Sequence, residues 1–334
     1  GVSFDVYRRT TSDMISAGTT LPASFGAASP VRNFGELQAA GWELLVNYNH
    51  EFSNGLAFSA TGSLADGREK ITKFFNPTRN ITQNYVGRYI GDIWGFETDR
   101  LFQEDDFAGV DPATGRWIYR DGIPVQNALE SGAFRFGPGD IKYKDLNGVG
   151  IISLGDGTVD DPGDRRIIGN ETPRYQFGLR LAANWKRVDL ATYLQGVGKR
   201  QFWHRSKLVT PGRDNSIFGA AWFDYQVDYW RPDNTDAFYA RPTNNDSWNY
   251  NPQTRYLLDM SYLRVKNITL GYSLPRLSFI PVDDLRVYVS GENLFTLDGL
   301  GNIPIDPETG AVNNTIGASY PYRATLSFGM QTTF

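Results

Sequence analysis

The chain has no cysteine, few histidines and no long apolar run, and each absence excludes a class of structure. Without cysteine, disulfide bonds and thiolate metal sites are excluded. Only His50 and His204 are available for a histidine-based metal site or a nucleophile triad, which is little material for either. No run of about 18 apolar residues occurs, so we expect no transmembrane helix.

Basic residues are not in excess either. The 33 Lys and Arg residues are outnumbered by 37 Asp and Glu residues, and the formal net charge is −4. Nucleic-acid binding needs clustered basic residues against the phosphates, so we expect no nucleic-acid partner.

Enzyme signatures are missing as well. The carboxylate pairs in the sequence are adjacent residues, whose side chains point to opposite faces of an extended chain and cannot act together as acid and base: Asp105-Asp106, Asp160-Asp161 and Asp283-Asp284. No glycine-rich phosphate loop precedes a helix. The sequence therefore predicts a protein that is not an enzyme.

Extended structure dominates the pattern. Helical periodicity is nearly absent, and 35 Gly and 17 Pro residues separate about nine segments with strand character. These segments are Val2–Arg9, Trp42–Glu51, Leu56–Leu64, Tyr89–Leu101, Tyr175–Lys186, Val188–Trp203, Tyr256–Leu274, Leu285–Leu297 and Tyr322–Phe334. Some are joined by short turns, whereas 102–172 and 204–255 are long loops, and this asymmetry is typical of outer-membrane barrels.

The carboxyl-terminal segment alternates polar and apolar residues. Its apolar residues share one face of a strand: Ala324, Leu326, Phe328, Met330 and Phe334. Its polar residues share the other: Arg323, Thr325, Ser327, Gln331 and Thr333. In a second strand, Tyr175 and Trp185 lie ten residues apart on one apolar face. In a strand tilted by about 40° they would be separated by roughly 25 Å along the membrane normal, which matches the height of an outer-membrane apolar band. The alternation of polar and apolar residues reverses near Asn267, where we expect a β-bulge or a change of environment.

Several segments carry the resemblance to a known family, in a fixed order along the whole chain. They are Gly137–Gly148, Ile168–Asn170 with Pro173 and Tyr175, Trp230–Asn234, Asp259–Pro275, Arg286–Thr296 and the Tyr320-Pro321 step. This combination strongly resembles the C-terminal part of SusC-like TonB-dependent transporters.

The resemblance implies a transmembrane antiparallel β-barrel of 22 strands in the bacterial outer membrane, with an N-terminal plug, a TonB box and a lid lipoprotein similar to SusD. Residues 1–334 are too few for such a barrel, so we expect them to be a C-terminal segment, without the plug and the N-terminal strands. The remaining strands would then come from a missing segment or a second polypeptide. The strand near Val2–Arg9 should accordingly not pair with the strand near Arg323–Phe334, and outer-membrane lipid should surround the barrel.

Aromatic residues gather in or beside the second long loop and are candidates for substrate contact. Aromatic faces stack on sugars and bury large areas in protein contacts. The candidates are Trp203, Trp222, Tyr225, Tyr229, Trp248 and Tyr250. A core of the loop, or a contact with the lid partner, is the alternative role, and for Trp230 the resemblance favours a structural one.

The segment from Asp145 resembles a calcium loop, with candidate ligands Asp145, Asn147 and Asp156. Val149 stands where a further oxygen ligand is expected, and the last position is Asp rather than Glu. We therefore prefer an ordinary Asn-Gly turn and expect no cofactor, with calcium as the alternative.

The function expected from the resemblance is import of a large nutrient, a glycan oligomer or a peptide, coupled to TonB. A soluble, secreted carbohydrate-binding β-protein is the first rival. A β-rich glycosidase is the second, and it would need two carboxylates about 5 to 10 Å apart in one cleft.

Overall fold

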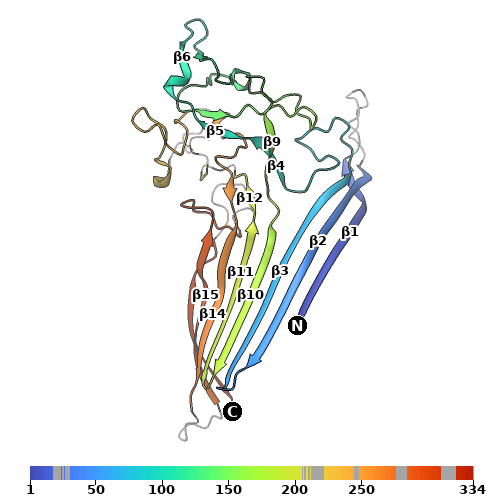
Figure 1. Ribbon diagram of the computed structural model, residues 1–334, viewed down its shortest axis with the longest axis vertical. Coiled ribbons are helices and arrows are strands. Elements are labelled where there is room, and N and C mark those ends of the chain that lie inside the picture. The colour runs from blue at the N-terminus through green and yellow to red at the C-terminus, as the bar shows by residue number, and fades with distance from the viewer. Residues whose placement is uncertain are drawn as a thin grey trace.

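A computed structural model shows a long curved sheet with a folded mass of loops at one end (Figure 1). It describes residues 1–17, 24, 26, 31–204, 206, 208, 209, 211, 222–243, 248–275, 284–309 and 321–333. No helix among these residues is long and apolar enough to cross a membrane.

The sheet has eight antiparallel strands, in the order β1-β2-β3-β10-β11-β14-β15-β16. The strands are β1 (Val2–Ala17), β2 (Val31–Glu51), β3 (Leu56–Lys73), β10 (Arg174–Trp185), β11 (Val188–Lys199), β14 (Tyr262–Ser273), β15 (Asp284–Asp298) and β16 (Thr325–Thr333). Each strand pairs with the next barrel strand along the chain, which is the meander expected of an outer-membrane barrel. The all-β antiparallel fold is therefore confirmed.

One of the nine expected strands does not belong to this sheet. Tyr89–Leu101 instead contains two short strands, β4 (Asp92–Phe96) and β5 (Thr98–Leu101), which pair within the loop region. Phe96 is buried there, so the apolar residues of this segment fill a loop core rather than face lipid. The two long loops consequently span 74–173 and 200–261 in place of 102–172 and 204–255.

The two ends of the sheet differ in their connections. Short turns at 52–55 and 186–187 join strands at one rim, and the two long loops leave from the opposite rim. Figure 1 shows these loops gathered together beyond the ends of β3, β10 and β11. We call residues 74–173 and 200–261 the cap.

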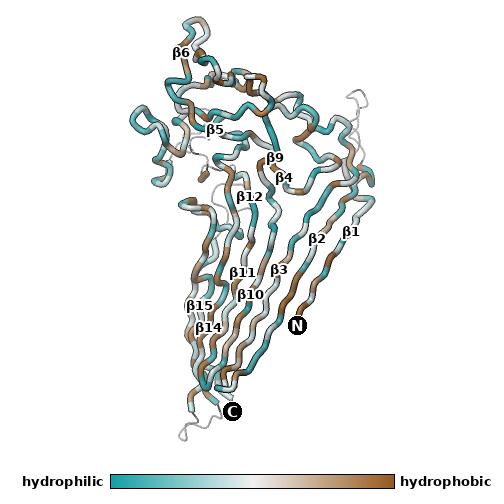
Figure 2. The backbone as a smooth tube through the Cα atoms, in the orientation of Figure 1, coloured by the Kyte–Doolittle hydropathy of each residue, from teal (hydrophilic) through white to brown (hydrophobic). Residues whose placement is uncertain are grey.

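Apolar side chains line up across the strands on one face of the sheet. The register places residues of six neighbouring strands in one row: Val46, Gly62, Leu179, Leu194, Val265 and Phe295. A second row, four residues further along the strands, contains Ala183, Leu190, Leu270, Val289 and Phe328. Phe328 is 80% exposed and Leu326 is 59% exposed, so the apolar face has no protein covering among the described residues. Apolar residues recur along these strands in Figure 2.

The opposite face is polar. One of its rows runs through Asn47, Thr61, Arg180, Tyr193, Asn267, Glu292 and Thr325. Hydrogen bonds connect neighbours on this face: the Thr61 hydroxyl donates to Oδ1 of Asn47 at 2.9 Å, and Asn267 Nδ2 donates to the Ser290 hydroxyl at 3.1 Å. The alternation read from the sequence thus separates an apolar outer face from a polar inner face, as in a barrel with a wet lumen.

The bulge expected near Asn267 is confirmed. Pairing of β14 with β15 shifts between Val265 and Asn267, and pairing of β11 with β14 shifts at Tyr193 and Leu194. The extra residue restores the apolar parity on the outer face.

The sheet is open. Among the described residues β1 pairs with β2 alone, and β16 pairs with β15 alone. As expected, β16 is not laddered to β1.

Small two-stranded sheets make up the cap. They pair β4 with β9 (Arg165–Asn170), β5 with β8 (Ile141–Tyr143), β6 (Phe107–Val110) with β7 (Trp117–Tyr119), and β12 (Gln201–Phe202) with β13 (Leu258–Asp259). Short 3-10 turns lie between them: η2 (Glu104–Asp106), η3 (Asn127–Leu129), η4 (Asp224–Gln226) and η5 (Trp248–Tyr250). The cluster of buried apolar residues belongs mostly to this cap rather than to the large sheet.

The face assignment predicts unequal effects for two neighbouring substitutions. Leu326→Arg places a charge on the apolar face and should cost about 2 to 4 kcal/mol near the bilayer midplane, whereas Thr325→Arg, on the polar face, should cost much less. Unfolding free energies of the two variants in lipid bilayers would measure this difference. Equal costs would show that the faces are assigned wrongly.

Candidate functional site

The cap holds together through contacts between its two segments. The backbone N–H of Phe96 donates to the carbonyl of Pro252 at 2.8 Å, and the Thr98 hydroxyl donates to Oε1 of Gln253 at 2.7 Å. The rings of Phe96 and Tyr143 stack at 4.4 Å in the core. Residues about 155 positions apart in sequence thereby form one folded unit.

A buried carboxylate joins the two segments. Asp140, in the first segment, is completely buried. It accepts hydrogen bonds from Nε and Nη2 of Arg241 at 2.9 and 2.7 Å, from Nδ2 of Asn249 at 2.8 Å and from the backbone N–H of Gly137 at 2.8 Å. These four donors replace the water that the carboxylate loses on burial.

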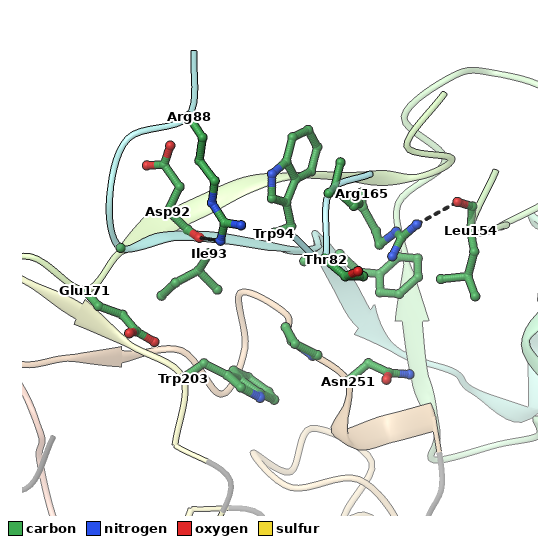
Figure 3. Close-up of a pocket in the computed structure, with 15 residues that line it drawn as sticks. Thr82, Arg88, Asp92, Ile93, Trp94, Leu154, Arg165, Glu171, Trp203 and Asn251 are labelled. Carbon is green, nitrogen blue, oxygen red and sulfur yellow. Dashed lines mark hydrogen bonds between the residues drawn. The ribbon is translucent and has the colours of Figure 1, made fainter. Parts of the chain in front are cut away.

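Next to this core is a cavity of about 530 Å³ (Figure 3). Its lining combines indole rings, charged side chains and an amide: Trp94, Trp203, Arg165, Glu171, Arg88, Asp92 and Asn251. In Figure 3 the two indoles lie on opposite sides, with Arg165 toward one end and Glu171 toward the other. Ligand sites combine apolar and aromatic walls with a few placed polar groups, and this cavity has both, with polar groups making up about half of its lining.

Arg165 is one of two cations in this cavity that have no carboxylate partner among the described residues, the other being Arg88. It donates from Nη2 to the Leu154 carbonyl at 2.7 Å and from Nε to the Pro162 carbonyl at 3.1 Å. Burial lowers the pKa of Arg165, against the opposing charge of Asp161, but an arginine stays protonated at neutral pH. A charged guanidinium bound only to carbonyls can still receive an anionic ligand group.

The other charged pair in the cavity is used internally. Asp92 accepts from the backbone N–H of Tyr89 at 3.0 Å and from Nδ2 of Asn170 at 2.8 Å. Arg88 donates to the carbonyls of Gln83 and Asp92 at 2.8 and 2.9 Å. These contacts fix the backbone before β4, so we assign both residues a structural role.

The aromatic residues predicted to contact substrate occupy different environments. Trp203 is 4% exposed, lies at the cavity and packs in the cap core. Tyr250 is also 4% exposed and lies in that core. The Tyr225 hydroxyl donates to the Leu208 carbonyl at 2.9 Å, and the rings of Trp222 and Tyr229 meet edge to face at 5.0 Å. The side chain of Trp248 lies outside the described residues.

Of the six, then, the structure brings Trp203 to the cavity. Ligand contact by the set stays a prediction. Trp94, Arg165 and Glu171 were not predicted, because only the pairing of β4 with β9 and the return of the second segment bring them together.

The proposed calcium ligands are engaged with their own loop. Asp145 accepts from the backbone N–H groups of Gly148 and Gly150, both at 2.7 Å, and Asn147 accepts from Val149 at 3.1 Å. Among the described residues no three His, Cys, Asp or Glu side chains gather as a metal site would require, so Asp156 is not brought together with Asp145 in such a group. These contacts close the loop through its own side chains, and both the Asn-Gly turn and calcium binding stay predictions.

Comparison with known proteins gives a consistent assignment. No family model matches the chain. Two proteins of Formosa agariphila are similar to it: TonB-dependent receptor P3, 27% identical over 360 residues, and TonB-dependent receptor P26, 24% identical over 351 residues. They match 100% and 98% of the chain, which spans 32% of each relative, or about a third of their length.

Solved structures share the fold. The RagAB peptide transporter matches with a TM-score of 0.65 at 21% identity, over 100% of this chain and 33% of that one. The RagAB peptide importer in its closed-closed state matches with a TM-score of 0.66 at 21% identity and the same coverage. Together with the receptors, these matches confirm the resemblance to SusC-like TonB-dependent transporters. The relatives are named as receptors and the solved neighbours as a peptide transporter or importer, which agrees with the expected outer-membrane location and with the expectation that the chain is not an enzyme.

The Asp140 contacts predict that a single substitution loosens the cap. Asp140→Asn removes the charge that Arg241 pairs with and should cost roughly 3 kcal/mol in the cap. Asp233→Asn is the matched control, because the Arg231–Asp233 pair is exposed, at 45% and 78% of the two side chains, and should contribute less than about 1 kcal/mol. Hydrogen exchange of the cap amides would measure both. Similar exchange in the two variants would contradict the role given to Asp140.

Proposed function

We propose that this chain forms barrel wall and extracellular cap in a TonB-dependent importer that takes up a nutrient too large for porins, a peptide or a glycan oligomer. One observation carries the proposal: an uncovered apolar face crosses the sheet in register and lies opposite a polar face, below a folded cap. Receptors of the TonB-dependent class match the chain over nearly all of its length, which supports the same assignment.

The importer needs parts beyond the described residues. The outer edges of β1 and β16 need further strands, because unpaired N–H and C=O groups in lipid cost several kcal/mol each. We propose that a missing segment or a second polypeptide supplies the remaining strands. A plug with a TonB box would couple the importer to TonB, and a SusD-like lipoprotein would form a lid over the cap.

The cap cavity is the proposed contact with the nutrient. Arg165 offers a positive charge beside the indoles of Trp94 and Trp203, which suits a ligand with an anionic group next to an apolar or ring face. A peptide carboxylate and an acidic sugar both meet this description.

A soluble carbohydrate-binding β-protein is the rival. It would share the aromatic loops, but it would leave the apolar rows through Leu179 and Phe328 facing water, which is unfavourable over so large an area. The observations therefore favour the importer.

Uptake by energised cells tests the function. Cells that carry the full-length transporter should accumulate labelled peptides or labelled oligosaccharides, and a protonophore should abolish that accumulation. Uptake that continues unchanged after the membrane is de-energised would contradict TonB-dependent import. The labelled class that accumulates identifies the nutrient.

Arg165→Gln tests the cavity. Loss of a charge-assisted hydrogen bond should lower uptake at limiting substrate by about tenfold or more. Arg166→Gln is the matched control, because Arg166 is paired with Glu97 at 2.6 Å and its side chain is 55% exposed. If both substitutions lowered uptake equally, Arg165 would not be a ligand-binding residue.

A further inference from the structure

The apolar outer face ends in a group of cations at the cap side of the sheet. The register of β1, β2 and β3 gives successive rows on this face: Phe4–Leu44–Leu64, then Val6–Trp42–Asp66, then Arg8–Ala40–Arg68, then Thr10–Gln38–Lys70. Rows lie about 7 Å apart along a strand. Arg8, Arg68 and Lys70 thus follow directly beyond the aromatic and apolar rows, on the same face.

Small side chains between the cations leave a hollow. Ala40 separates Arg8 from Arg68 by two strand spacings, about 10 Å. A surface pocket of about 270 Å³ lies on the Arg68 side of this row, and its lining includes Ala40, Trp42, Arg68, Lys70 and the paired Asp66 and Arg174. Arg8 does not line the pocket and lies across Ala40 from it by the register of the strands. Two long arginines on either side of an alanine can converge on one anion.

Two of the cations are held in place by a ring. The guanidinium of Arg68 lies 3.8 Å from the centre of the Tyr89 ring, and Lys70 Nζ lies 5.7 Å from it. Stacking fixes the plane of a guanidinium and leaves its N–H edge available for bidentate contact with an oxyanion. The group is therefore partly preorganised.

Acidic groups do not neutralise this cluster. Asp66, the carboxylate in the neighbouring row, is bound by both Nε and Nη2 of Arg174. Arg8, Arg68 and Lys70 form no ion pair with any carboxylate among the described residues, and all three are exposed. Three uncompensated positive charges remain at the edge of the lipid-facing band.

We propose that Arg8, Arg68 and Lys70 bind the phosphate of an anionic lipid in the outer leaflet, with the acyl chains of that lipid lying along the apolar rows below. The position of this site at the edge of the apolar face favours a lipid as the source of the phosphate. A phosphate held at the Arg8–Ala40–Arg68 row is continuous with the apolar face through Trp42, and an aromatic residue at this depth is usual where a membrane meets water. A basic cluster beside a membrane-spanning surface is the common form of an anionic-lipid site.

The test uses the full-length transporter, because the proposal rests on its place in the outer membrane. Lipid retention is measured by native mass spectrometry after transfer into detergent with added diphosphorylated lipid A, with the same lipid freed of phosphate, or with inorganic phosphate as competitor. The wild-type protein should retain phosphorylated lipid A and release the dephosphorylated form. The triple variant R8A/R68A/K70A should bind the phosphorylated lipid about tenfold or more weakly.

A second variant and a matched control keep the result interpretable. Ala40→Glu places a carboxylate between the two arginines and should also abolish retention while every cation stays in place. The control R9A/K186A/R187A removes the same number of charges from the opposite face and the opposite rim and should retain lipid normally. Heat-modifiable migration in electrophoresis verifies that each barrel is folded.

Three outcomes would overturn the proposal. They are equal retention in the wild-type, triple and Ala40→Glu proteins, equal retention of dephosphorylated lipid, and displacement of the lipid by inorganic phosphate at matched concentration. Each of these leaves the import function untouched when the variants are inserted in the outer membrane. Recovery of the wild-type protein outside that membrane would instead contradict the proposed function and the lipid site together.

Discussion

Pairing of backbone polar groups is the constraint on which this structure depends. In lipid no water is available to an N–H or C=O group, so every strand that crosses the membrane must be hydrogen-bonded on both sides. The eight strands form one meander in which each inner strand is hydrogen-bonded on both sides. The outer edges of β1 and β16 need further strands to pair their N–H and C=O groups. The same ladders fix the register, and the register decides which side chains face outward. The apolar rows, the polar face and the cationic row at Arg8 and Arg68 all follow from it.

The large sheet and the cap are stabilised in different ways. The sheet has little apolar core of its own, since its apolar face is uncovered and its polar face looks inward. The cap, by contrast, folds like a small soluble domain, with buried aromatic rings and the paired carboxylate of Asp140. The large sheet therefore supports a cap with its own buried core, and the cavity with Arg165 lies in that cap.

Local pattern was sufficient to predict most of the sheet. Alternation over Tyr175–Trp185 and over the last strand assigned side chains to faces correctly, because a period of two needs no knowledge of the partner strand. The bulge near Asn267 was predictable for the same reason. Pattern failed at Tyr89–Leu101, where Ile93 and Phe96 are apolar because they fill the cap core, and a short apolar run does not reveal what covers it. The cavity was beyond prediction, because Arg165 and Trp203 come to line it only when two segments distant in sequence fold together.

We propose that the apolar face of the sheet contacts lipid in an outer-membrane barrel. Nitroxide labels placed one at a time along 324–330 of the full-length protein in bilayers test it most directly, through collision with oxygen dissolved in lipid and with a water-soluble nickel complex. Contact with lipid predicts an alternation of period two, with labels at Leu326, Phe328 and Met330 reached by oxygen and labels at Thr325 and Ser327 reached by nickel. Accessibility to nickel at every position, without alternation, would contradict it.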